Sequence, residues 1–290
     1  GRRTVRQILI GAGCDETMPM PFLAPGDLEN AGLSSTAISI SNPLVQEESL
    51  LRTSLMPGQL KIISYNQSHR IKKLKFFEIG HVYLPSEDDQ LLPDEREYLS
   101  ISIAGGDATE IVAILDMISL TMAFPNMQLK QQQIEGLHPG RSAQVFVAGQ
   151  ERGAVGEVDP RVLRNYGIDD SVAWLELDLG SILAGPFGKK KYTSVSKYPS
   201  SDIDLAFEVP DDTSSASVAG CLRKAGGTYL KEVQLFDSYK ADTANEGVRS
   251  LAYSLRFQSD VGTLTDAEVS ELRAACISEV EQKTNAKLRE

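Results

Sequence analysis

The chain has 290 residues, and a length of roughly 150 residues per domain predicts about two domains with room for a sizeable core. Its 41% hydrophobic and 24% charged residues are typical of a globular protein and exclude wholesale disorder. The net charge of −11 argues against a surface covered with phosphate contacts, and no apolar run reaches the length of a membrane-spanning helix. The cysteines, Cys14, Cys221 and Cys276, lie far apart, which predicts neither a disulfide framework nor a zinc site and fits a reducing cytoplasm. Because the chain starts with Gly1 and no signal peptide follows, we expect a piece of a longer protein.

The first part of the chain alternates predicted helices with predicted strands. Helical spacing or a proline at the first turn predicts helices over residues 4–12, 57–66 and 108–124. Strands are predicted over residues 37–40, 74–84, 98–104, 142–148, 154–158 and 173–179. An acidic loop joins the second and third of these strands, so we expect them to form an antiparallel pair. The pattern as a whole indicates an antiparallel sheet of the α+β type.

A boundary is predicted between Gly188 and Lys189. Gly185-Pro186-Phe187-Gly188 interrupts the periodic pattern, and three lysines follow it. The lysines are either a solvated linker or a hinge that touches phosphate. The net charge is −9 before this boundary and −2 after it, so residues 189–290 are nearly balanced.

The second part has a simpler order of elements. Strands are predicted over residues 203–209, 230–239, 250–258 and 286–289, and helices over residues 215–225 and 265–285. Thr265 and Glu268 have the spacing of a capping box at the start of the second helix. The resulting β-α-β-β-α-β order is that of the ferredoxin-like split unit, whose sheet often leaves one face open to single-stranded RNA.

No constellation of catalytic or metal-binding residues is found. His69, His81 and His138 lack metal-ligand spacing and are expected to be surface or hydrogen-bonding residues. Gly11 and Gly13 begin like a dinucleotide-binding loop but lack its third glycine, so we interpret them as a helix stop. The carboxylates of residues 87–95 are interpreted as a solvated loop rather than a cation site.

Short blocks of sequence follow one another in a specific order and spacing. In the first part they are Asn42-Pro43-Leu44, Glu48-Ser49-Leu50-Leu51-Arg52-Thr53-Ser54-Leu55, Phe77-Glu78-Ile79-Gly80, His138-Pro139-Gly140-Arg141 and Gly156-Glu157-Val158. In the second part they are Ser196-Lys197-Tyr198-Pro199, Asp204-Leu205-Ala206, Leu235-Phe236-Asp237-Ser238-Tyr239 and Ser250-Leu251-Ala252-Tyr253. Together they resemble the β subunit of bacterial phenylalanyl-tRNA synthetases, over essentially the whole chain.

The resemblance implies a fold and a function for each part. Residues 1–188 would be a non-catalytic class II synthetase-like core, an antiparallel sheet with flanking helices that packs against the catalytic α subunit. Residues 189–290 would be a ferredoxin-fold domain that binds the anticodon of tRNA-Phe. The whole enzyme would be a cytoplasmic α2β2 heterotetramer that uses ATP and Mg to aminoacylate tRNA-Phe, with no cofactor held by this part. The family's editing, Mg-binding and N-terminal tRNA-binding domains would precede Gly1.

The sequence also supports a silent core. An active class II core needs arginines in its motifs 2 and 3, because the planar guanidinium group clamps phosphate oxygens. No arginine follows the last strand into Gly180-Ser181-Ile182-Leu183-Ala184-Gly185, and none lies two positions before Glu78. We therefore assign no catalytic residue. Residues 42–68 are expected to contact the α subunit through Leu44, Leu50, Leu51 and Leu55, unless these leucines are internal core.

Four residues are expected, by the same resemblance, to face the anticodon: Ala206, Asp237, Tyr239 and Ser250. Tyr239 offers a ring for base stacking, and Asp237 can accept hydrogen bonds from a guanine edge. Alternatively, Asp237 and Tyr239 only cap a strand and bond to local backbone.

The sequence departs from the family at one position of the expected RNA-binding domain. The family has Arg-Asp-Leu-Ala where this chain has Ile203 before Asp204. Either Lys197 and Arg249 compensate for the lost positive charge, or anticodon affinity is lower. Two further classes remain open at this point: a free-standing RNA-binding or scaffold protein built from these domains, and an active adenylate-forming ligase.

Overall fold

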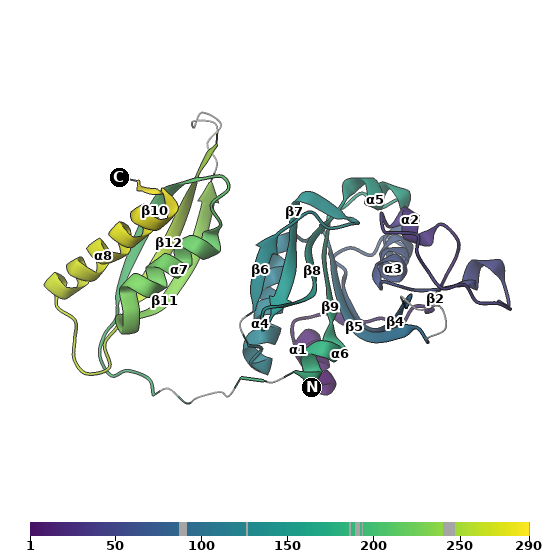
Figure 1. Cartoon of the computed structure of the whole chain (residues 1–290), viewed down its shortest axis with the longest axis horizontal. Coiled ribbons are helices and arrows are strands. Elements are labelled where there is room, and N and C mark those ends of the chain that lie inside the picture. The colour runs from purple at the N-terminus through teal and green to yellow at the C-terminus, as the bar shows by residue number, and fades with distance from the viewer. Residues whose placement is uncertain are drawn as a thin grey trace. The chain divides into compact units, whose positions relative to one another are not determined.

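The computed structural model describes residues 1–86, 92–125, 127–185, 187–188, 192, 194–239 and 247–289. The chain divides into two compact units, Gly1–Lys190 and Lys191–Glu290, and each is described by itself (Figure 1). The three lysines at the predicted boundary and residues 87–91 of the acidic loop lie outside the described residues. The division between Gly188 and Lys189 therefore stays a proposal.

A seven-stranded sheet forms the centre of the first unit. Its strands, in order across the sheet, are β1 (Asp15–Glu16), β4 (Lys75–Leu84), β5 (Asp94–Ala104), β9 (Val172–Asp178), β8 (Gln150–Val158), β7 (Leu137–Val147) and β6 (Gln128–Gln131). Only the short edge strand β1 pairs in parallel; every other neighbouring pair is antiparallel. The predicted pairing of residues 74–84 with 98–104 is confirmed, and β5 begins earlier than predicted, at Asp94. A separate two-stranded sheet contains β2 (Phe22–Leu23) and β3 (Leu50–Leu51).

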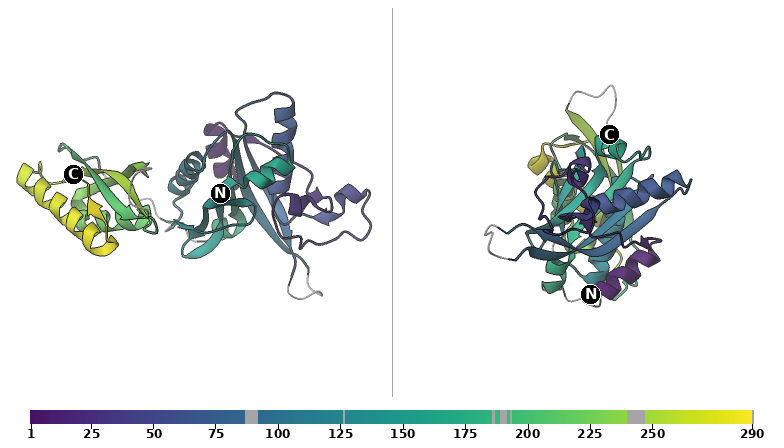
Figure 2. Two further views of the ribbon diagram at one scale, coloured as in Figure 1. Left: turned by 90° about the horizontal axis from the view of Figure 1, so that it is seen from above. Right: turned by 90° about the vertical axis from the view of Figure 1, so that its right-hand side faces the viewer.

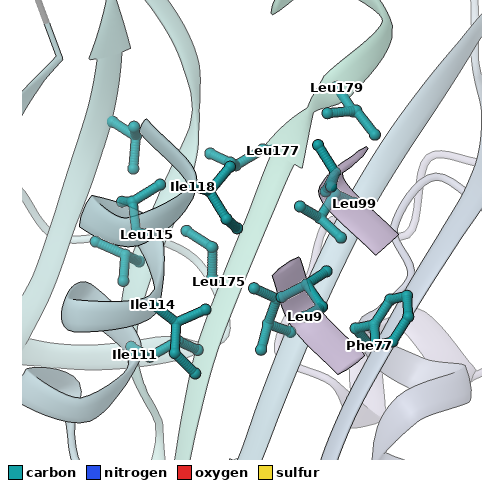
Figure 3. Packing of buried hydrophobic residues seen from close by; sticks show 14 of the residues in the cluster. Leu9, Phe77, Leu99, Ile111, Ile114, Leu115, Ile118, Leu175, Leu177 and Leu179 are labelled. Carbon is teal, nitrogen blue, oxygen red and sulfur yellow. The ribbon is translucent and has the colours of Figure 1, made fainter. Parts of the chain in front are cut away.

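One face of this sheet is covered by α1 (Arg2–Gly11), α4 (Ala108–Met122) and α6 (Leu179–Ala184). Alternate residues of the strands and the apolar stripe of α4 meet in a continuous core, and Figure 3 shows Ile111, Leu115 and Ile118 pointing toward Leu175 and Leu177. The side chain of Asp107 caps α4 by accepting hydrogen bonds from two backbone N–H groups of its first turn, at 2.9 and 3.0 Å. The predicted helix over residues 108–124 is confirmed apart from its last two residues.

The other face of the same sheet packs against α3 (Met56–Ser68) and α5 (Pro160–Asn165), so helices lie on both sides (Figure 2). The short helix α2 (Asp27–Asn30) lies against α3. Leu60 and Ile63 of α3 are fully buried, as predicted, and Pro57 occupies the first turn of this helix. A one-turn 3₁₀ helix, η1 (Gln46–Glu48), precedes β3. The second face thus holds its own core around Trp174.

The second unit has the predicted β-α-β-β-α-β order. Its elements are β10 (Ser201–Pro210), α7 (Ser215–Gly226), η2 (Gly227–Tyr229), β11 (Leu230–Tyr239), β12 (Val248–Phe257), α8 (Asp266–Thr284) and β13 (Lys287–Leu288). The four strands pair antiparallel in the order β11-β12-β10-β13, and α7 and α8 lie side by side across one face (Figure 1). The capping box at Thr265 is present: its N–H donates to Glu268 at 2.7 Å, and Glu268 N–H donates back at 3.3 Å.

Candidate nucleic-acid interface

The four-stranded sheet of the second unit has one face without helices, which we call the open face. Leu205 and Phe207 of β10, like Leu251 and Tyr253 of β12, are buried beneath α7 and α8. Because side chains alternate along a strand, the residues between them point to the open face. Ala206 pairs directly with Ala252 there, and Glu208 pairs with Ser250.

A β-bulge decides which residues of β11 reach this face. Val233 and Leu235 pair with the buried residues Leu255 and Tyr253, so by simple alternation Asp237 and Tyr239 would also face the helices. The register shifts between Leu235 and Asp237, where Phe236 is the additional residue. As a result Asp237 pairs with Ala252 and Tyr239 pairs with Ser250, on the open face.

The structure therefore brings the four predicted residues together. They occupy two neighbouring rows, one with Ala206, Ala252 and Asp237, and the other with Glu208, Ser250 and Tyr239. Ala252 was missed by sequence reasoning, and its small side chain lies directly beside that of Ala206. Whether these residues contact an anticodon stays a prediction, because placement alone does not show binding.

The side chains of Asp237 and Tyr239 are available to a ligand. Tyr239 is 53% exposed, and neither side chain makes a hydrogen bond to any described residue. Local capping, which was the alternative to RNA contact, is therefore not seen among the residues that the structure describes.

The open face carries more acidic than basic side chains. Asp202, Asp204, Glu208, Glu232 and Asp237 share it with Arg256 and Lys287. Arg256 is held by carboxylates, with its Nε 2.8 Å from Asp202 and its Nη1 3.3 Å from Glu232. Its hydrogen bond keeps the pKa of the Asp202 carboxyl below the ordinary value. Lys287 is exposed and has no ion pair within the described part of the chain, so few groups here can bind phosphate.

The structure places the residues at which a change in positive charge was expected. Ile203 pairs with Leu255 and packs against the core on the helix side, so an arginine at this position would not lie among the open-face rows. Arg249 pairs with the buried Val209, and its Nη2 donates to the Thr213 carbonyl at 2.7 Å. Its side chain thus starts from the helix side of the sheet and not from the open face. Lys197 is exposed in the segment before β10.

The first unit holds a buried ion pair on the α3 side of the large sheet. Arg52 Nη1 lies 2.6 Å from Glu78 Oε1, and the two side chains are only 7% and 4% exposed. Burial raises the pKa of the Glu78 carboxyl although Arg52 opposes this, and its Oε2 has no hydrogen-bond partner within the described part. The guanidinium group is thus engaged by a carboxylate and by the His81 carbonyl, and is not free to clamp a phosphate.

Residues 42–68 divide between surface and core. Leu44 is 96% exposed, whereas Leu55 is completely buried against α3 and its neighbours. Leu50 and Leu51 are half-buried in β3. The expectation that all four leucines reach a partner is therefore wrong for Leu55, which is internal core.

Within the described ranges, no three His, Cys, Asp or Glu side chains are grouped closely enough to hold a metal ion. No helix in those ranges is long and apolar enough to cross a membrane.

Comparison with known proteins identifies the family. The family model "Phenylalanyl tRNA synthetase beta chain CLM domain" matches residues 1–179, which is more than half of the chain. The chain belongs to this family. The model "Ferredoxin-fold anticodon binding domain" matches residues 196–289. The resemblance and the fold class given by the sequence are both confirmed.

Relatives in the phenylalanyl-tRNA synthetase family match almost the entire chain. Phenylalanine–tRNA ligase β subunits from Clostridium tetani and Geobacillus kaustophilus are 32% and 30% identical, over 98% and 99% of this chain. The chain spans about 37% of the length of each. A solved pyrrolysyl-tRNA synthetase, Desulfitobacterium hafniense PylSc, aligns over 63% of this chain and 66% of its own, with a TM-score of 0.51 and 17% identity. This last similarity shows a shared synthetase fold and no more.

Proposed function

We propose that the chain carries the synthetase-like core and the anticodon-binding domain of a phenylalanine–tRNA ligase β subunit. In this proposal the second unit binds the anticodon of tRNA-Phe, and the first unit is a non-catalytic core that supports a catalytic α subunit. The observation that carries it is the clustering of Ala206, Asp237, Tyr239 and Ser250 on the open face. The family membership and the matched anticodon-binding domain support it.

Each of the four side chains has a chemical role in this proposal. The ring of Tyr239 stacks on an unpaired base, and Ala206 with Ala252 lets a base approach the sheet closely. Asp237 accepts hydrogen bonds from N1 and N2 of a guanine at the first anticodon position, and Ser250 donates or accepts. The acidic surroundings predict fewer than about three phosphate contacts and a shallow salt dependence.

The test measures binding of the 290-residue chain to an anticodon stem-loop of tRNA-Phe. Tyr239→Ala should weaken binding by about 1–3 kcal/mol, as expected for the loss of one stacked base. Asp237→Asn should chiefly reduce the preference for guanine at the first anticodon position. Tyr229→Ala is the matched control, because this tyrosine is also exposed but lies in η2, away from the two rows. If both Tyr239→Ala and Asp237→Asn bind like the unchanged chain, the assigned surface is wrong.

We infer that ATP and Mg are used by the α subunit of an α2β2 assembly in the cytoplasm, not by this chain. A class II site needs cations to hold a triphosphate. The cavity on the α3 side of the large sheet has no lysine, arginine or histidine among its lining residues, so it does not fit ATP. The chain alone should therefore show no ATP–pyrophosphate exchange; exchange that follows the purified chain would refute a silent core and favour an adenylate-forming ligase.

The proposed α-subunit surface is the exposed part of residues 42–68. Leu44 and Tyr65 expose large apolar groups there, and Tyr65 borders a groove of about 350 Å³ with Met20 and Ile62. An obligate interface should bury well over 1,000 Å² or so. Leu44→Glu with Tyr65→Glu should abolish co-purification with a phenylalanyl-tRNA synthetase α subunit. Leu120→Glu is the control, since Leu120 is exposed on α4, which packs on the opposite face of the sheet. If the chain does not bind a folded α subunit at micromolar concentration, the result would instead fit a free-standing RNA-binding protein.

A further inference from the structure

The α3 side of the large sheet contains a cavity of about 340 Å³, which we call the Glu176 cavity. Its floor includes Gln144, Ala154, Trp174 and Glu176, and Ser54 lies at its wall just before α3. The volume lies in the range of small-molecule sites. Nothing in the proposed function uses this cavity, which lies in the first unit and not in the anticodon-binding unit.

The register of three strands explains why a cavity exists here. Gln144 of β7 pairs with Ala154 of β8, which pairs with Glu176 of β9, so the three side chains form one row on the same face. The central member of the row is alanine, and its short side chain leaves space between the amide group of Gln144 and the carboxyl group of Glu176.

Both polar members of this row have capacity for another partner. Glu176 Oε1 accepts from Leu55 N–H at 2.7 Å and from Ser54 Oγ at 3.0 Å, while Oε2 is 3.1 Å from the same hydroxyl group. A single hydroxyl proton serves both oxygens, which leaves Oε2 with free lone pairs. Gln144 is only 6% exposed, and its side-chain amide makes no hydrogen bond to any residue that the structure describes.

The charge of the lining selects the ligand. Glu135, Glu151 and Glu176 line the cavity, and none of its lining residues is a lysine, arginine or histidine. A carboxylate or phosphate would have no cationic partner here, which excludes nucleotides and disfavours zwitterionic amino acids. Trp174, which is almost completely buried, adds apolar surface to the floor, and aromatic rings also attract cations.

We propose that the Glu176 cavity binds a primary ammonium group carried on a small apolar body. The ammonium group donates hydrogen bonds to Glu176 Oε2 and to the side-chain oxygen of Gln144. The hydrocarbon part lies over Ala154 and Trp174. An ammonium group can belong to a free amine or to a lysine side chain of another protein, and the experiment separates the two.

The test uses the fluorescence of Trp174, the one tryptophan of the chain. The 290-residue chain is titrated with n-butylammonium chloride at pH 8, with 1-butanol, sodium butyrate and sodium chloride as matched ligands. We expect the fluorescence to change with n-butylammonium until it saturates. The affinity for 1-butanol should be roughly 10- to 100-fold weaker, because 1-butanol lacks the charged hydrogen bond. Butyrate and chloride should give no saturable change. Equal binding of n-butylammonium and 1-butanol, or no saturable change with n-butylammonium, would overturn the proposal.

Variants of the cavity complete the test. Glu176→Gln keeps an acceptor for Leu55 N–H and Ser54 but removes the charge, and should weaken n-butylammonium binding by roughly tenfold or more. Glu47→Gln is the control, because Glu47 is an exposed residue of η1 that does not line the cavity, and it should change the affinity less than about twofold. Unchanged affinity in Glu176→Gln refutes the assignment even if the cavity binds amines. Weaker binding of Nα-acetyl-lysine methylamide than of n-butylammonium indicates a free amine, and equal or tighter binding indicates a lysine side chain.

Discussion

The carboxyl group of Glu176 makes the stability of the first unit depend on pH. Burial raises the pKa of this group from its ordinary 4.5 to about 7. The hydrogen bonds from Leu55 N–H and Ser54 oppose the rise, the negative charge of Glu78 adds to it, and Arg52 opposes it. The folded chain therefore holds this proton at a pH at which the unfolded chain has released it.

The sign and size of the effect follow from linkage. Because the pKa is higher in the folded state, the stabilisation is complete below pH 4.5 and is lost as the pH rises through about 7. The difference between the two pKa values corresponds to about 3 kcal/mol at roughly 1.4 kcal/mol per pH unit. The carboxyl group borders the Glu176 cavity, and this contact reduces the effect. We therefore expect the free energy of unfolding to fall by about 2 kcal/mol between pH 5 and pH 8.

Replacement of Glu176 by glutamine isolates the effect. The amide oxygen still accepts from Leu55 N–H and Ser54 but does not titrate, so other ionisable groups cancel in the comparison with the unchanged chain. Urea unfolding is followed by the fluorescence of Trp174, which reports on the first unit alone. Between pH 5 and pH 8 the free energy of unfolding of Glu176→Gln should rise by about 2 kcal/mol relative to the unchanged chain. The exposed control Glu151→Gln should differ from the unchanged chain by a free energy of unfolding that stays constant with pH. The same constant difference for Glu176→Gln would refute the reasoning.

Three further predictions concern packing and burial. Arg52→Met should destabilise the first unit by about 3–5 kcal/mol in urea unfolding, because it leaves the buried carboxylate of Glu78 unpaired, and adding Glu78→Gln should recover part of that loss. Gly153→Ala should lower the thermal unfolding temperature and destabilise the first unit by about 2 kcal/mol or more. The glycine has φ +151°, and an added Cβ would lie 2.0 Å from the carbonyl oxygen of Glu176. A variant as stable as the unchanged chain would show that β8 relaxes freely. Burial raises the pKa of the Cys276 thiol to about 11, so iodoacetamide at pH 8 should modify this thiol only after unfolding. Mass spectrometry follows the modification, and fast modification of the folded chain would contradict the buried position.

The second unit could be predicted almost completely from its sequence because its signals are local. Thr265 and Glu268 mark the start of α8, and Gly227, with φ +54°, marks the end of α7. Alternating apolar residues gave β10 and β12 to within two residues at each end. The face of the sheet to which Asp237 and Tyr239 point could not be derived from alternation. The bulge at Phe236 depends on pairing with β12, a strand further along the chain.

The first unit shows where local signals fail. β6 contains a single apolar residue, Leu129, and forms because β7 offers it an edge to pair with. α5 was not predicted although Asp159 before Pro160 is a cap signal, since six residues bury too few side chains to show a period. Glu176 stands between two leucines and has the pattern of an exposed strand residue. The segment before α3 and the elements on that one side of the sheet cover it, and no local pattern reports such coverage.

The bulge in β11 also changes how the second unit tolerates alterations of chain length. In an ordinary strand the removal of one residue turns every later side chain to the opposite face. At Phe236 the strand already holds one residue more than β12 opposes, so deletion of Phe236 would make the pairing regular from Glu232 to Tyr239. Asp237 would remain opposite Ala252, and Tyr239 opposite Ser250. The surface proposed to bind the anticodon is thus compatible with two lengths of β11, and a one-residue gap at this place in a homologous sequence is no sign that the interface has been lost.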